Sequence, residues 1–172
     1  MIYDKSETAC LTGHRPKNLP WHYDETKDNC VRFKNDLREI LERAIKYGLK
    51  NFLIGMAEGF DMIAAELLLK LRRSYGYIKI IAVIPFVGQE RMWQSIQRER
   101  YHKILKQCDD KIILSQKYTD DCLNDRNKFM VENSSVIIAC HNGKPSGTGN
   151  TIKYGRRSSC KIKIININNY VE

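Results

Sequence analysis

Apolar residues follow two different periods along this chain. From about residue 26 to residue 47 they recur at spacings of three and four, which predicts an amphipathic helix. The run IKIIAVIPF at 78–86 is continuous and rich in β-branched residues, as in strands buried on both faces. The same criteria predict strands at 8–12, 51–55, 111–115, 136–140 and 162–168, and further helices at 62–73, 90–107, 123–134 and from residue 150 or 151.

Strands and helices therefore alternate throughout the sequence. This order predicts an α/β fold: a single domain with a mostly parallel sheet of about six strands, joined by right-handed crossovers and covered by helices on both faces. The 172 residues, of which 42% are hydrophobic, suffice for one core, and no linker or internal repeat divides them.

Composition narrows the class of protein further. The first ten residues lack the pattern of a signal peptide and no apolar run approaches the roughly 20 residues of a membrane span, so we expect a cytoplasmic protein without a membrane partner. The formal charge of +9 makes nucleic acid a possible partner, but it is not favoured because the positive residues are spread over several helices. The six cysteines show no metal-ligand spacing, so neither a metal nor another cofactor is expected.

The segment MIAAELLLKL at 62–71 is apolar around most of its circumference. A helix of this kind needs more cover than a sheet alone provides. We therefore expect a homodimer or higher oligomer whose interface includes this helix.

In parallel sheets of this class ligands bind beyond the carboxyl ends of the strands, which selects three loops. The first contains TGHRP, the second GMAEGFD, and the third HNGKPSGTGNT. Glycine amides, hydroxyls and a helix N-terminus make the third loop the expected phosphate site. Asp61 in the second loop is expected to cap the following helix, and Gly55, Gly59 and Gly147 are expected to be required by the backbone shape.

The segments CLTGHRP, GMAEGFDMIAAE, IPF with Gln89 and Trp93 downstream, DRNKFMV and SGTGNT occur in one order over about residues 8 to 155. In this they resemble the YpsA-like branch of the SLOG superfamily, which groups the DNA-processing DprA/Smf proteins with the LOG, or lysine-decarboxylase-like, proteins. The resemblance implies a Rossmann-like domain that binds a nucleotide or a nucleotide-derived ligand.

Arg126 matches the LOG arginine at the phosphoribosyl site and is the best candidate for a phosphate contact. The alternative for Arg126 is an exposed residue at a helix start, and for His14 and Arg15 it is a role in ordering their loop only. The implied ligand-binding residues are Thr12, Gly13, His14, Arg15, Gly55, Met56, Ala57, Glu58, Gly59, Asp61, Arg126, Asn127, Gly147, Thr148, Asn150 and Thr151.

One departure from the LOG pattern bears on catalysis. LOG hydrolases carry a glutamate three residues after the threonine of their glycine motif, and Thr151 occupies that position here. Glycosidic cleavage normally needs such a carboxylate. The expected function is therefore to bind, sense or sequester a nucleotide derivative such as an ADP-ribose-like molecule. The alternatives are a LOG-type N-glycosidic hydrolase and a DprA-like single-stranded DNA-binding protein.

Overall fold

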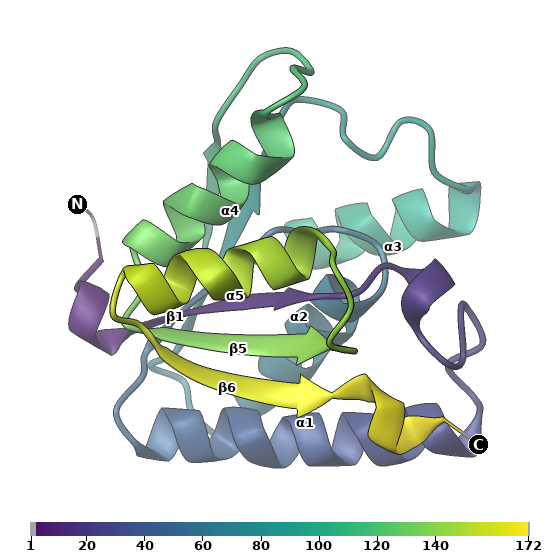
Figure 1. Ribbon diagram of the computed structural model, residues 1–172, viewed down its shortest axis with the longest axis horizontal. Coiled ribbons are helices and arrows are strands. Elements are labelled where there is room, and N and C mark those ends of the chain that lie inside the picture. The colour runs from purple at the N-terminus through teal and green to yellow at the C-terminus, as the bar shows by residue number, and fades with distance from the viewer. Residues whose placement is uncertain (1–2, 172) are drawn as a thin grey trace.

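The computed structural model describes residues 3–171 as one α/β domain with helices on both faces of a six-stranded sheet (Figure 1). The strands are β1 (Thr8–Gly13), β2 (Asn51–Ile54), β3 (Lys79–Ile84), β4 (Asp110–Ile113), β5 (Val136–His141) and β6 (Lys161–Asn166). The helices are α1 (Asp28–Lys46), α2 (Phe60–Leu71), α3 (Ser95–Leu105), α4 (Cys122–Glu132) and α5 (Gly147–Arg157).

All strand pairs are parallel, in the order β4-β3-β2-β1-β5-β6, which confirms the predicted fold class. Starting from β1, the chain first builds outward through β2, β3 and β4, and then returns to add β5 and β6 on the other side. The reversal places a topological switch point between β1 and β5, where the loops leaving the two strands separate and leave room for a ligand.

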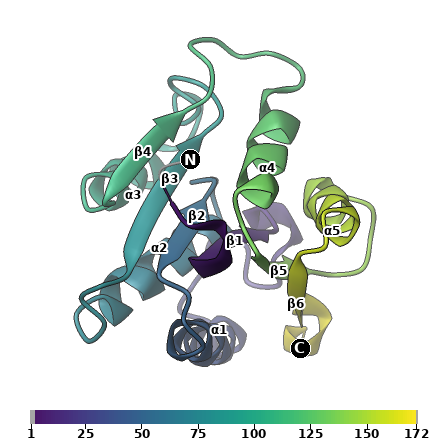
Figure 2. The same cartoon turned by 90° about the vertical axis from the view of Figure 1, so that its left-hand side faces the viewer.

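Figure 2 shows helices on both faces of the sheet, and a hydrophobic layer lies between the sheet and the helices on each face. Alternate residues along each strand point to opposite faces, so Leu11 packs on the side of α1 and α2 while Cys10 packs on the side of α4 and α5. The central strands are buried on both faces for this reason. The long apolar run at 78–86 follows from that burial, as the sequence predicted.

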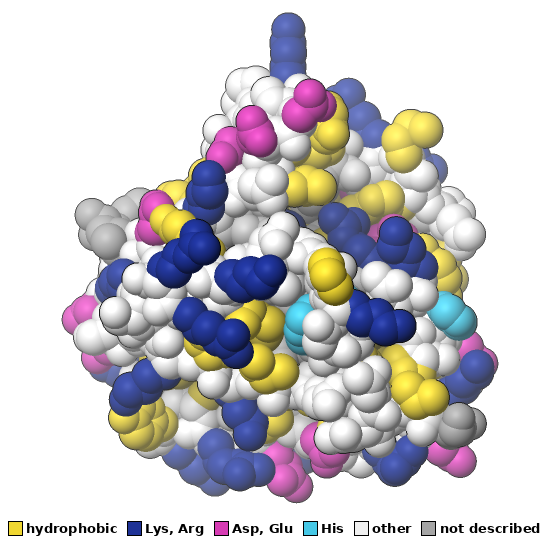
Figure 3. All heavy atoms as spheres, viewed as in Figure 1, with side chains coloured by type: hydrophobic (Ala, Val, Ile, Leu, Met, Phe, Trp, Pro, Cys, Tyr) yellow, Lys and Arg dark blue, Asp and Glu magenta, His cyan; other side chains and the backbone are white. Residues whose placement is uncertain are grey.

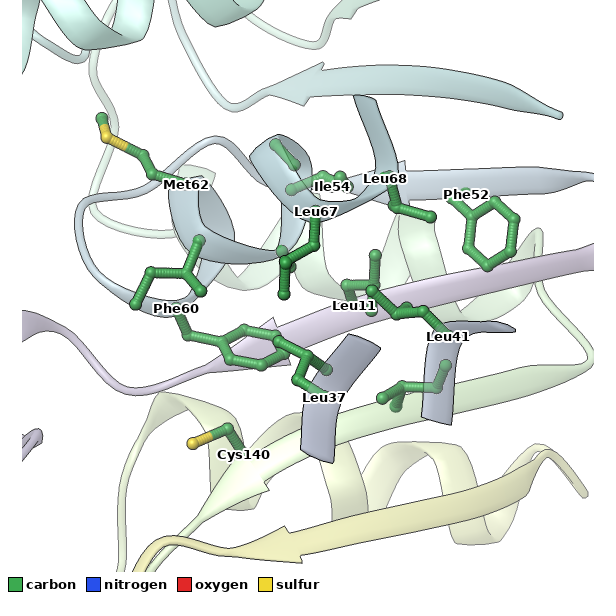
Figure 4. Close-up of a cluster of buried hydrophobic side chains, with 14 of the residues drawn as sticks. Leu11, Leu37, Leu41, Phe52, Ile54, Phe60, Met62, Leu67, Leu68 and Cys140 are labelled. Atoms are coloured by element: carbon green, nitrogen blue, oxygen red, sulfur yellow. The ribbon is translucent and has the colours of Figure 1, made fainter. Parts of the chain in front are cut away.

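Helix α2 fills the larger layer. Figure 4 shows Leu67 and Leu68 of α2 beside Leu11 of β1, with Leu37 and Leu41 of α1 close to them. Helix α2 also contacts α3, so its apolar surface is covered within the same chain. The reason given for an oligomer through this helix is therefore wrong, because no broad apolar face of α2 is left for a second copy.

Two predicted helix starts are wrong. Helix α3 begins at Ser95 and not at residue 90, because Gly88 takes a φ of 82° and opens separate turns before the helix. Helix α5 begins at Gly147, three or four residues before the predicted start at 150 or 151, because Ser146 caps it. Each start is set by a single loop residue, Gly88 or Ser146, and such a residue leaves no trace in the spacing of apolar positions from which the helices were predicted.

Within residues 3–171 no helix combines the length and apolar character needed to cross a membrane. Over the same residues, no three His, Cys, Asp or Glu side chains come together in a way that could hold a metal ion. The cysteines of this part of the chain are all free thiols.

Candidate functional site

A cleft of about 450 Å³ lies at the predicted edge of the sheet, where β1 and β5 end. Its walls come from the loops after both strands, from the start of α2 and from α4. The predicted residues that line it are Thr12, Gly13, His14, Arg15, Ala57, Asp61, Arg126, Asn127, Gly147 and Thr148.

The other predicted residues lie outside this cleft. Gly55, Met56 and Gly59 belong to the β2–α2 loop and are buried within it. Glu58 is near the surface, where its carboxylate accepts a hydrogen bond of 3.4 Å from Tyr23. The remaining two, Asn150 and Thr151, line a neighbouring cavity between α4 and α5.

The prediction missed several lining residues: Leu11, Lys17, Asn18, Asp120, Leu123, Asn124, Met130, Pro145 and Ser146. Four of them had a signal in the sequence. Lys17 follows the predicted Arg15 in the same loop, and Asn124 lies three residues before Asn127 and so on the same side of α4. Pro145 and Ser146 directly precede the predicted Gly147 in the third loop. For the remaining residues the sequence offered no such cue.

Gly55, the first residue of the β2–α2 loop, makes room for Arg126. A Cβ built on Gly55 would lie 2.5 Å from the guanidinium carbon of Arg126. In the space left by the missing side chain, Nη1 of Arg126 donates a hydrogen bond of 2.7 Å to the Gly55 carbonyl. Gly55 is therefore required, and the group that occupies its space belongs to the protein.

Gly59 meets the loop after β1 in a similar way. Its φ of 90° is open to glycine and rarely to other residues, and a Cβ there would lie 2.7 Å from the backbone oxygen of His14. The next amide, that of Phe60, donates to the same His14 oxygen at 3.2 Å. The start of α2 is thus filled by the first loop.

Asp61 does not cap α2, contrary to the prediction. Gly59 holds the N-cap position, and Asp61 lies inside the first turn with its carboxylate turned back to accept a hydrogen bond of 3.1 Å from the Ala57 amide. The carboxylate is buried, and burial raises its pKa although the positive charge of Arg126 opposes that rise. Asp61 therefore orders the β2–α2 loop and offsets part of the charge of Arg126.

Arg126 is itself buried, with 7% of its surface exposed, so its alternative role as an exposed residue at a helix start is wrong. Its Nε group donates to the Asn127 side chain at 2.9 Å, and Nη1 donates to Gly55. Within residues 3–171 no carboxylate lies within 4.0 Å of it and its Nη2 group has no acceptor, although the side chain lines the cleft. Arg126 is thus anchored by two of its nitrogens and leaves the third available to a ligand.

The β5–α5 loop is built differently. Ser146 takes an extended conformation, and its hydroxyl accepts a hydrogen bond of 3.1 Å from the Gly149 amide, which caps α5. The amides of Gly147 and Thr148 find no acceptor among the described residues. A Cβ built on Gly147 would meet nothing within 4 Å, and Gly147 has no positive φ. The expectation that backbone shape requires Gly147 is therefore wrong.

His14 connects this loop to the first one. Nε2 of His14 accepts a hydrogen bond of 3.0 Å from the Asn142 amide, and the rings of His14 and His141 lie 5.3 Å apart. Burial and the neighbouring His141 lower the pKa of His14, which keeps Nε2 unprotonated as this hydrogen bond requires. His14 thus joins the β1 and β5 loops across the switch point.

The charges around the cleft favour an anion. Arg15, Lys17 and Arg126 line it, whereas its carboxylates are the buried Asp61 and the exposed Asp120. Arg15 and Lys17 form no ion pair with any described residue. Unpaired cations beside free helix amides are the typical groups of a phosphate site.

The YspA SLOG family profile matches residues 9–169. The chain belongs to this family. A prophage-derived protein of Bacillus subtilis, YoqJ, is 26% identical over 141 residues, which are 74% of this chain and 82% of that protein. A UPF0398 protein of Bacillus velezensis is 28% identical over 144 residues, which are 83% of this chain and 79% of that protein.

Two solved structures of DNA processing protein A share the fold of this SLOG family member at 16% sequence identity. The protein from Streptococcus pneumoniae superposes with a TM-score of 0.61 over 93% of this chain, which spans 50% of that protein. The protein from Helicobacter pylori, described for its single-stranded DNA binding mode, superposes with a TM-score of 0.60 over 95% of this chain and 71% of its own.

Proposed function

We propose that this SLOG protein binds a nucleotide or a nucleotide-derived ligand, such as an ADP-ribose-like molecule, in the cleft between β1 and β5, and senses or sequesters it. The observation that carries this proposal is the empty space beside Gly147. Two amides without an acceptor border the cleft there, and the Arg126 side chain forms part of the same cleft. A phosphate would meet these groups without displacing any part of the protein.

Binding without hydrolysis is favoured by the position where LOG hydrolases carry their glutamate. The Thr151 hydroxyl is buried and donates a hydrogen bond of 3.0 Å to the Gly147 carbonyl within its own helix. It supplies no carboxylate for acid or base catalysis. Incubation with nucleoside monophosphates should therefore release no free base, and release at an enzymatic rate would support the hydrolase alternative.

The test of binding is calorimetric titration of AMP and ADP-ribose into the wild-type protein and Gly147→Val. The added side chain enters the open space and should lower affinity about tenfold or more, if it costs one charge-assisted contact of about 1.5 kcal/mol. Gly76→Val is the matched control, because Gly76 is exposed, also has open space and lies away from the cleft. Equal binding by wild type and Gly147→Val would contradict this site.

Single-stranded DNA is the second candidate because of the two DNA processing protein A neighbours. Lysine and arginine side chains gather around α5 on the face drawn in Figure 3, and such a face attracts phosphate backbones. A long oligonucleotide should then bind with an affinity that falls steeply with salt concentration. Loss of binding that follows several surface lysines but not Gly147 would favour this candidate over a nucleotide cleft.

A further inference from the structure

The cavity between α4 and α5 is separate from the cleft but shares a wall with it. Asn124 and Asn127 line both spaces, so a ligand that passes over these two side chains would enter the cavity directly from the cleft. The cavity measures about 370 Å³. Each space alone lies near the lower end of the range for small-ligand pockets, roughly 300 to 1,000 Å³.

The lining of this cavity is basic. Lys128 comes from α4, and Lys153 and Arg157 come from α5, where their spacing of four residues puts them on the same side of the helix. Asp121 is the acidic residue of the lining. Among the described residues no carboxylate lies within 4.0 Å of any of the three cations, so their charges are not neutralised by the protein.

Neutral polar groups complete the cavity. The side-chain amides of Asn124 and Asn150 make no hydrogen bond to any described residue, although both line the cavity. Tyr154 adds a partly buried ring, whose hydroxyl donates to Glu132. Free amides beside an aromatic ring and unpaired cations can contact the base, the sugar and the phosphate of one nucleotide unit.

We propose that this cavity is a second phosphate subsite, and that the preferred ligand is a phosphodiester-linked dinucleotide or the phosphorylated end of an oligonucleotide. This inference rests on the proposed function, which places the terminal phosphate at Gly147 and Thr148. The first nucleotide fills the cleft. The chain of the ligand passes Asn124 and Asn127, and the phosphodiester of the second unit enters the cavity and lies against Lys128 and Lys153.

The test compares AMP, ADP-ribose and the dinucleotide pApA by calorimetric titration. Wild-type protein should bind pApA about tenfold or more tightly than AMP, because the second phosphate gains charge-assisted contacts. ADP-ribose, whose two phosphates are adjacent, should not show this gain. The double variant Lys128→Gln/Lys153→Gln should bind pApA only about as well as AMP and leave AMP affinity nearly unchanged.

The matched control is Lys103→Gln/Lys106→Gln, which removes the same charge from exposed positions that line neither space. It should leave the pApA preference intact. The inference is overturned if wild type binds pApA no more tightly than AMP, or if the control pair loses as much as the cavity pair. Binding of AMP that depends on Gly147 would in that case leave the proposed function standing, whereas failure of every nucleotide to bind overturns both. If pApA binds and a longer oligonucleotide binds more tightly still, the ligand is the oligonucleotide end.

Discussion

The β2–α2 loop and the β5–α5 loop both place glycines at or near the start of a helix, but the space beside those glycines is used in different ways. In the first loop, Arg126 fills the space beside Gly55 and the His14 carbonyl fills the space beside Gly59. In the second loop, the space beside Gly147 is open. A glycine-rich turn is therefore a candidate ligand site only where the protein itself does not occupy the room that the glycine makes.

The backbone amides of the two loops differ in whether the protein itself supplies their hydrogen-bond acceptors. Phe60 and Ala57 donate to His14 and Asp61, so two amides at the start of α2 are already satisfied. The amides of Gly147 and Thr148 have no acceptor among the described residues. The contrast gives the first loop a structural role and leaves the second loop for the proposed binding role. Single substitutions can test each half of this comparison.

The largest effect is expected for Gly59→Ala. The substitution forces a φ of 90° on a residue with a Cβ and presses that atom against the backbone oxygen of His14. Backbone strain and overpacking together should lower the free energy of unfolding by about 3 kcal/mol or more. Urea denaturation measures the change, and a loss below about 1 kcal/mol would show that the loop can move to accept a side chain.

Gly55→Ala should cost about 2 kcal/mol, because its Cβ overlaps the Arg126 guanidinium. The double variant Gly55→Ala/Arg126→Ala removes one side of this overlap. Its loss should therefore be smaller than the sum of the two single losses by about 1 kcal/mol or more. Additive losses in a double-mutant cycle would mean that Gly55 and Arg126 do not compete for one space.

The contact between the two loops should depend on pH through His14. Because its folded pKa lies below the ordinary value of 6.5, the unfolded chain binds more protons between these two values. Stability should be fully present above pH 6.5 and fall as the pH drops through the folded pKa. His14→Gln should flatten this part of the profile in thermal unfolding.

The smallest effect on stability is expected for Gly147→Val. No atom lies within 4 Å of the new Cβ, so the free energy of unfolding should change by less than about 0.5 kcal/mol. Thermal unfolding beside Gly76→Val is the measurement. A loss comparable to that of Gly59→Ala would remove the distinction between the two loops.

Much of the fold could be predicted because its strands and helices have clear periods, and the cleft could be located because parallel strands deliver their loops to one edge. The sequence could not show that Arg126 reaches Gly55, 71 residues away, or that Asp61 turns back to Ala57. Both contacts depend on how separate loops pack together. The prediction that Asp61 caps α2 was wrong for this reason, because Gly59 takes the N-cap position and Asp61 lies in the first turn of the helix.

The overlap at Gly55 also limits how related sequences can diverge. A side chain at position 55 and a guanidinium at position 126 exclude each other, so the two positions should change together among descendants of a common ancestor. Glycine and arginine would then persist as a pair even in relatives that have exchanged one ligand for another. Positions 55 and 126 should therefore be constrained by packing within the fold, while sequence differences around Gly147 and the α4–α5 cavity should follow the ligand that each protein binds.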